Sequence, residues 1–112
     1  MRRAIAVIAV LLAGCQSSDV SRDLGARCTT ARECDDRCLT ASASYPDGFC
    51  TVNCSTGDEC PSDAACVADE GGACMFTCRE DRDCEFLGAA WRCHDSALRG
   101  QPETKVKTCR GQ

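Results

Sequence analysis

The sequence has 112 residues, of which 13 are cysteine, and a formal net charge of −4 at neutral pH. The acidic balance argues against nucleic acid as a partner and against electrostatic docking on anionic lipid. Beyond residue 15, only eleven of 97 residues are Leu, Ile, Val or Phe, well below the roughly 20% that an ordinary hydrophobic core requires. The twelve cysteines of this stretch therefore indicate a small disulfide-rich fold that matures in an oxidising compartment.

The first fifteen residues have the pattern of an export signal. Arg2 and Arg3 precede an uncharged run over residues 4–13. A membrane-spanning helix needs about 20 apolar residues, so the run is too short to span and is typical of the helical apolar region of a signal peptide. The run ends in the tetrapeptide LAGC at residues 12–15.

This tetrapeptide resembles the lipobox of bacterial lipoproteins. The resemblance implies that residues 1–14 are a signal peptide, and that the Cys15 thiol takes a diacylglycerol. The new amine of Cys15 would also be acylated, so that palmitate-type acyl chains attach the protein to a membrane. Lipidation would also explain the odd cysteine count, since twelve remain to pair. The alternative is a plain secretory signal cut elsewhere, which leaves Cys15 as an odd thiol.

The cysteines after Cys15 repeat in groups of four. Residues 16–27 are polar and aperiodic, so residues 15–27 are expected to be a lipidated cysteine with a flexible tether. Each later group opens with C-x5-C, consecutive groups are joined by C-x3-C, and an acidic residue always precedes the second cysteine. We interpret these groups as tandem units at residues 28–53, 54–77 and 78–112.

Each unit is expected to contain a helical turn and a short β-hairpin. The C-x5-C loop would form a single turn, with Thr29 or Ser55 as its cap. The acidic residue before the second cysteine would belong to a solvated face with an ordinary pKa. Extended segments around the third and fourth cysteines would pair through turns such as PDG at residues 46–48. In the third unit, a longer loop over residues 95–104 would separate the two strands.

The helical turn constrains the disulfide pairing. Two cysteines spaced C-x5-C in a helix have Cα atoms about 9 Å apart, which is too far for a bridge. Four cysteines allow three pairings within a unit, and spacing alone does not decide among them. We favour first to third and second to fourth, because this pairing ties the turn to both strands. The predicted pairs are Cys28–Cys38, Cys34–Cys50, Cys54–Cys66, Cys60–Cys74, Cys78–Cys93 and Cys84–Cys109.

The cysteine spacing resembles that of small modules in secreted animal proteins, such as the amino-terminal region of the Dickkopf proteins and other knottin-like units. The chain as a whole, with LAGC followed by cysteine repeats, is similar to the cysteine-rich lipoproteins of Gram-negative bacteria. That resemblance implies a location in the cell envelope, reached by export in unfolded form. Gln16, and not the aspartate that retains such lipoproteins at the inner membrane, follows Cys15, which implies the outer membrane.

The sequence carries no motif typical of catalysis or of metal binding. Zinc and redox sites use C-x2-C pairs, which are absent, and His94 is the only histidine. No ladder of acidic residues with EF-hand spacing is present for calcium. We therefore predict a protein that is not an enzyme and has no cofactor and no metal site.

Large side chains gather in the third unit. Phe86, Leu87 and Trp91 are candidate contact residues, with Tyr45 beside the PDG turn as a further one, although Trp91 could instead cover disulfides. The favoured function is a binding or structural module of the outer membrane, whose partner is an envelope or extracellular protein or glycan. The alternative is a protease-inhibitor-like domain or a secreted effector, because rigid disulfide loops suit protease clefts.

Overall fold

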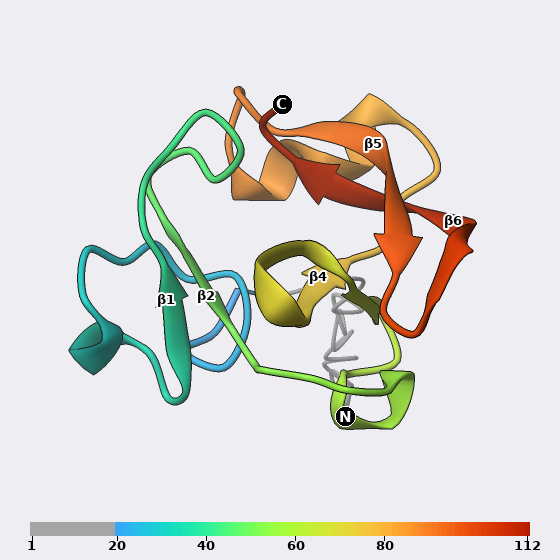
Figure 1. The fold of residues 1–112 in the computed structure, drawn as a ribbon. Helices are drawn as coiled ribbons and strands as arrows, with labels where there is room; N and C mark the ends of the chain where they lie inside the picture. Colours follow the sequence, from blue (N-terminus) through green and yellow to red (C-terminus); the bar gives the residue numbers. More distant parts are fainter. Residues whose placement is uncertain (1–19) are drawn as a thin grey trace, which may run out of the picture.

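A short helical turn followed by a β-hairpin recurs along the chain. The computed structural model describes residues 20–112, and in that range all four helical segments are 3₁₀ helices and the six strands pair only in antiparallel fashion (Figure 1). The elements are η1 (Ala31–Glu33), β1 (Arg37–Leu39), β2 (Phe49–Thr51), η2 (Gly57–Glu59), β3 (Ala64–Val67), η3 (Asp69–Gly71), β4 (Ala73–Phe76), η4 (Asp81–Leu87), β5 (Arg92–Leu98) and β6 (Gln101–Arg110). The predicted helical signal segment lies outside the described residues.

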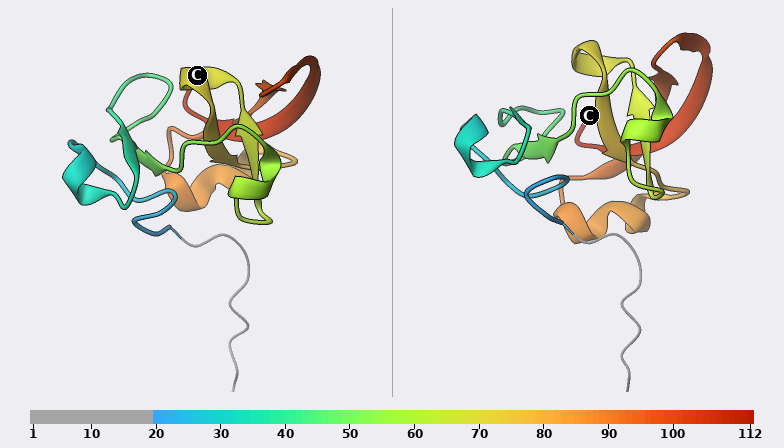
Figure 2. Two further views of the ribbon diagram at one scale, coloured as in Figure 1. Left: turned by 60° about the horizontal axis from the view of Figure 1, so that its bottom comes forward. Right: turned by 90° about the horizontal axis from the view of Figure 1, so that it is seen from below.

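The strands form two small sheets. Strands β1 and β2 pair with each other, and the second sheet has the order β4-β3-β5-β6. Figure 2 shows the β1–β2 hairpin and the β5–β6 hairpin on opposite sides of the β3–β4 hairpin. Strands β5 and β6 continue almost to the turn at residues 99 and 100. The loop expected over residues 95–104 is therefore largely strand. Most of its polar side chains occupy exposed strand positions, and the buried Ser96 shares a hydrogen bond with Thr108.

Two cysteines lie directly opposite each other in every hairpin. The register places Cys38 opposite Cys50, Cys66 opposite Cys74, and Cys93 opposite Cys109. None of these neighbours bond to each other. Each sulfur instead reaches one of the two cysteines that flank the preceding helical turn. The six disulfides are Cys28–Cys38, Cys34–Cys50, Cys54–Cys66, Cys60–Cys74, Cys78–Cys93 and Cys84–Cys109.

Three aromatic rings occupy the centre of the core. Phe49 follows the turn of the first hairpin, Phe76 ends the second hairpin, and Trp91 precedes the third, and each is at most 2% exposed. The Phe49 ring centroid lies 6.0 Å from that of Phe76 and 5.3 Å from that of Trp91. The few large apolar residues are thus concentrated where the hairpins meet, and buried cysteines surround them.

Residues 20–27 are folded against the first hairpin. Leu24 is 3% exposed and belongs to the core. The Gly25 N–H donates to the Cys50 carbonyl at 2.8 Å, and the Cys50 N–H donates to the Ala26 carbonyl at 2.8 Å. The prediction of a flexible tether is wrong for these residues, because backbone pairing and Leu24 hold them in place. The remainder of the predicted tether, residues 15–19, lies outside the described residues.

Candidate functional site

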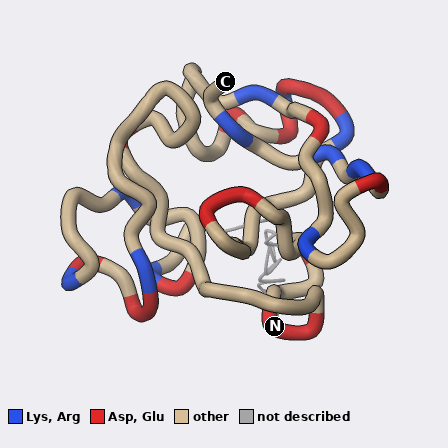
Figure 3. Tube along the Cα trace, viewed as in Figure 1, with Lys and Arg blue, Asp and Glu red and all other residues tan. Residues whose placement is uncertain are grey.

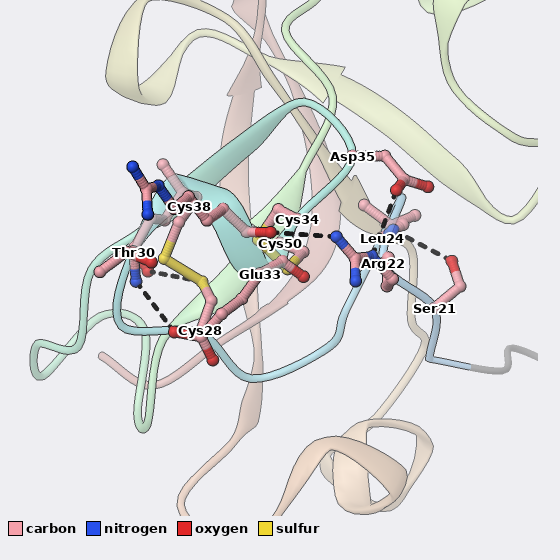
Figure 4. The surroundings of a disulfide bond; sticks show 12 residues. Ser21, Arg22, Leu24, Cys28, Thr30, Glu33, Cys34, Asp35, Cys38 and Cys50 are labelled. Atoms are coloured by element: carbon pink, nitrogen blue, oxygen red, sulfur yellow. Dashed lines mark hydrogen bonds and ion pairs between the residues drawn. A yellow bond between two sulfur atoms is a disulfide. The ribbon is translucent and has the colours of Figure 1, made fainter.

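The acidic residue before the second cysteine closes each helical turn. Glu33 accepts hydrogen bonds at Oε1 from the backbone N–H groups of Thr29 and Thr30, at 3.0 and 3.2 Å, and from the Thr29 hydroxyl (Figure 4). The same two backbone positions donate to Glu59 from Ser55 and Thr56, and to Asp83 from Arg79 and Glu80. Three turns therefore share one arrangement, in which a carboxylate satisfies N–H groups at the start of its own turn.

These hydrogen bonds change the acidity of the three carboxyl groups. The Thr29 hydroxyl and backbone N–H lower the pKa of Glu33, and backbone N–H groups lower the pKa of Glu59 and Asp83. The expectation of purely solvated acids with ordinary pKa values is wrong for these residues. The N-cap residues also differ by one position from the predicted Thr29 and Ser55. Thr30 and Thr56, in extended conformation, directly precede the turns. A repeated acid at a fixed distance from a cysteine was the sequence signal for this role.

Glycines two residues before the fourth cysteine allow a close backbone approach. A Cβ atom on Gly48 would lie 1.9 Å from the Cys28 carbonyl oxygen, and one on Gly72 would lie 2.1 Å from that of Cys54. In both cases the hairpin strand packs against the first cysteine of the same four. These two positions therefore accept no side chain without movement of the backbone that carries a disulfide.

Of the four predicted contact residues, only Phe86 is exposed. Leu87, Trp91 and Tyr45 are 6%, 2% and 7% exposed, whereas Phe86 is 41% exposed. The contact-patch prediction is wrong for the three buried residues, because they fill the space between hairpins in a chain with few other large side chains. Phe86 remains a candidate contact residue, with its ring centroid 5.0 Å from that of Phe76.

Tyr45 lines a small polar pocket between the first hairpin and η3. The pocket has a volume of about 290 Å³, and Arg37 and Glu70 line it together with Tyr45. Arg37 donates to the Glu70 carbonyl at 2.8 Å. Burial, and then the nearby Glu70 and Asp69 carboxylates, raise the pKa of Tyr45 to about 12. The phenol therefore keeps its proton at neutral pH and can act there as a hydrogen-bond donor.

A second depression lies between η2 and the turn that joins β5 to β6. Its volume is about 460 Å³, and its lining includes Thr56, Gly57, Ala65, Leu98 and Arg99. The Arg99 N–H donates to the Cys66 carbonyl at 3.0 Å, which fixes the turn against the second hairpin. Small residues, Leu98 and the longer polar side chains of Arg99 and Gln101 line this depression. Disulfides and backbone bonds hold the elements that carry them, so the depression offers a preformed contact surface.

Charged residues of both signs are interspersed over the described chain (Figure 3). Most of the ion pairs are exposed, such as Arg22 with Asp35 at 3.3 Å, and exposed pairs contribute little to stability. Arg110 and Asp69 form a more sheltered pair at 3.2 Å, which links the end of β6 to η3. The charge distribution thus does not single out a strongly charged docking face.

The sulfur atoms gather in threes, but all of them are oxidised. Within each cluster the sulfurs lie within 4.8 Å of one another. The first cluster is Cys28, Cys34 and Cys38, the second is Cys54, Cys60 and Cys74, and the third is Cys78, Cys84 and Cys109. A metal ion binds the thiolate form of cysteine, and these sulfurs are engaged in disulfides. Their role in this structure is to cross-link the chain.

The comparisons with known proteins add no relative. No protein-family model matches the sequence, and no curated protein and no solved structure is similar to it. Over residues 20–112, none of the helices is long and apolar enough to cross a membrane.

Proposed function

We propose that this protein is a lipid-anchored module of the cell envelope with a binding or structural role and no catalytic activity of its own. The observation that carries the proposal is the use of the cysteines. The described residues contain twelve cysteines, and all twelve are in disulfides. The thirteenth, Cys15, ends the LAGC tetrapeptide and lies outside the described residues. A cysteine that the fold does not use, at the position where a lipobox needs one, supports lipidation.

We further propose that the mature chain is a tandem of three units, at residues 28–53, 54–77 and 78–112. Each has a 3₁₀ turn followed by two paired strands, and each has interleaved disulfides. The closing carboxylates Glu33, Glu59 and Asp83 support the same division. A tandem of cross-linked hairpins is a rigid scaffold whose loops can be presented to a partner.

In this proposal the protein is held at the outer membrane by its acyl chains and contacts an envelope or extracellular protein or glycan. The depression between η2 and the β5–β6 turn is the contact surface that we favour, because it is preformed and accessible. The depression lies on the second and third units, at η2 and the β5–β6 turn.

The lipid anchor is tested by Cys15→Ser in the full-length chain. We expect wild-type protein in the membrane fraction, with a mature mass that includes diacylglycerol and an amide-linked acyl chain, and the variant in the aqueous phase after detergent partitioning. Unchanged mass and partitioning of the variant would refute lipidation.

The contact surface is tested by affinity capture from native envelopes with wild type, Gly57→Arg and Ala41→Arg. A Cβ on Gly57 meets nothing within 4 Å, so the variant should fold, while Ala41 is an exposed control outside the depression. We expect Gly57→Arg alone to lose the partner. Equal capture by all three proteins would refute this surface.

A further inference from the structure

Two exposed apolar side chains flank one buried ring. Val20 is 49% exposed and Phe86 is 41% exposed, and no other large apolar residue of the described chain is exposed. Both lie around Phe76. The Phe86 ring centroid is 5.0 Å from that of Phe76. A Cβ placed on Gly25 would lie 3.1 Å from Val20 Cγ1 and 2.7 Å from Phe76 Cε2. Val20 and Phe86, distant in sequence, thus both lie close to the Phe76 ring, and we refer to the two together as the apolar patch.

This patch lies where the described chain begins. Figure 2 shows the blue N-terminal end of the described chain beside η4, which carries Phe86. Cys15 precedes Val20 by five positions, and five residues span at most about 17 Å even when fully extended. Residues 20–27 are held by the Gly25 and Cys50 backbone bonds, so they do not lengthen the connection. A lipid on Cys15 would therefore keep the patch close to the bilayer surface.

The charged residues around the patch are of both signs, so they give it little net electrostatic attraction to a membrane. Arg27 Nη2 is 3.7 Å from the position of a Cβ on Gly88, in the turn that ends η4, and Arg27 also pairs with Asp47 at 3.7 Å. Glu85 lies next to Phe86 in the chain and is exposed. With both signs at its rim, the patch has apolar contact as its source of affinity for the boundary between headgroups and acyl chains.

We propose that Val20 and Phe86 form a membrane-facing patch that inserts at the headgroup–acyl boundary and fixes the orientation of the domain on the bilayer. The proposal rests on the proposed lipidation of Cys15. The domain then does not swing freely on a tether. Its β5–β6 turn, which Figure 2 shows on the side away from the N-terminal end of the described chain, points out from the membrane.

The test uses the full-length acylated protein in vesicles of phosphatidylethanolamine and phosphatidylglycerol. Phe86→Trp and Glu103→Trp add a reporter at the patch and at the exposed start of β6, and wild type gives the background from Trp91. In vesicles with lipid brominated near the headgroup, the reporter at position 86 should be quenched well beyond the wild-type background, because a side chain at the headgroup–acyl boundary lies beside the bromine atoms. The reporter at position 103 should keep its fluorescence and stay open to iodide.

The outcomes separate this inference from the proposed function. Membrane-bound, acylated protein with an unquenched reporter at position 86 would overturn the patch and leave lipidation standing. Shielding of that reporter from both brominated lipid and iodide would indicate a protein partner or a second copy at the patch, which also overturns the inference. Protein without acyl mass that does not float with vesicles would overturn both proposals.

Discussion

Replacing Gly72 with alanine should destabilise the protein far more than the same change at Gly71. The two neighbours both have positive φ, 112° at Gly72 and 80° at Gly71. They differ in their surroundings. A Cβ on Gly71 meets nothing within 4 Å, whereas one on Gly72 would lie 2.1 Å from the Cys54 carbonyl oxygen. The comparison therefore tests the added cost of pushing away the segment between β2 and η2 that carries Cys54.

The expected magnitudes follow from these surroundings. An alanine in the left-handed region costs about 1–2 kcal/mol, which is the cost expected at Gly71. Gly72 lies outside that region, with φ 112° and ψ 106°, so its strain cost is at least as large. Displacing Cys54 adds an overpacking cost of about 1–3 kcal/mol. It also threatens the hydrogen bond from the Cys54 N–H to the Gly72 carbonyl, which is 3.2 Å long and worth about 1 kcal/mol. We expect Gly71→Ala to lose about 1–2 kcal/mol and Gly72→Ala about 3–6 kcal/mol of unfolding free energy.

The assay is guanidinium unfolding with all disulfides intact, followed by circular dichroism. The denaturation midpoint of Gly71→Ala should fall slightly, and that of Gly72→Ala should fall several times further with a similar slope. A thiol titration of each variant checks that the cross-links have formed. Equal losses at the two positions would refute the reasoning, since strain alone would then account for both.

Further predictions concern the disulfides, the core and the titrating groups. Cys60→Ser should lose about 2–5 kcal/mol and show one free thiol after denaturation without reductant, which peptide mapping should locate at Cys74; a free thiol at another cysteine would contradict the pairing. Trp91→Ala should cost about 3–5 kcal/mol, and the half-exposed Phe86→Ala clearly less, a ranking that equal midpoints would disprove. The folded Glu59 pKa is lowered from 4.5, so its stabilisation is present above that pH and lost as pH falls through the folded pKa. In Glu59→Gln the free energy of unfolding should therefore fall less as the pH is lowered. An unchanged pH dependence would contradict a stabilising role for the Glu59 carboxylate. Tyr45, the single tyrosine, should ionise near pH 12 by ultraviolet absorbance, whereas a native midpoint near 10 would mean an exposed phenol.

Much of the local structure is predictable because the cysteines dominate the sequence. The C-x5-C spacing indicates a turn too long for its own cysteines to bridge, and turn residues such as PDG at 46–48 indicate hairpins. The structure has small antiparallel sheets, helical turns and six disulfides, as this fold class requires. The cysteine spacing and the turn residues both act over a few neighbouring residues, which explains why they can be recognised in the sequence alone.

The candidate site was harder to predict because burial depends on distant parts of the chain. Trp91 was open to two interpretations, and only the packing of Phe49 against it shows that it belongs to the core. Leu24 and Val20 are the two large apolar residues of a polar stretch, and no periodicity marks Leu24 as the buried one. The role of Glu59 was visible only as a repeated acid, because its hydrogen bonds depend on the backbone conformation of the turn.

The interleaved cross-links determine how the chain would respond to a protease. A single cut anywhere within residues 28–50, 54–74 or 78–109 leaves both fragments joined, because at least one disulfide spans every such position. Between Cys28 and Cys109, only the joints at residues 51–53 and 75–77 lack a spanning bond, as do residues 20–27 and 110–112 outside this range. Each joint is sheltered at its start, since Thr51 is 0% exposed and Met75 and Phe76 are 2% exposed, and the Thr51 hydroxyl donates to the Cys74 carbonyl. Each joint ends in an exposed residue, Asn53 or Thr77. A molecule cut once within any of the three spanned ranges would therefore keep its pieces covalently joined.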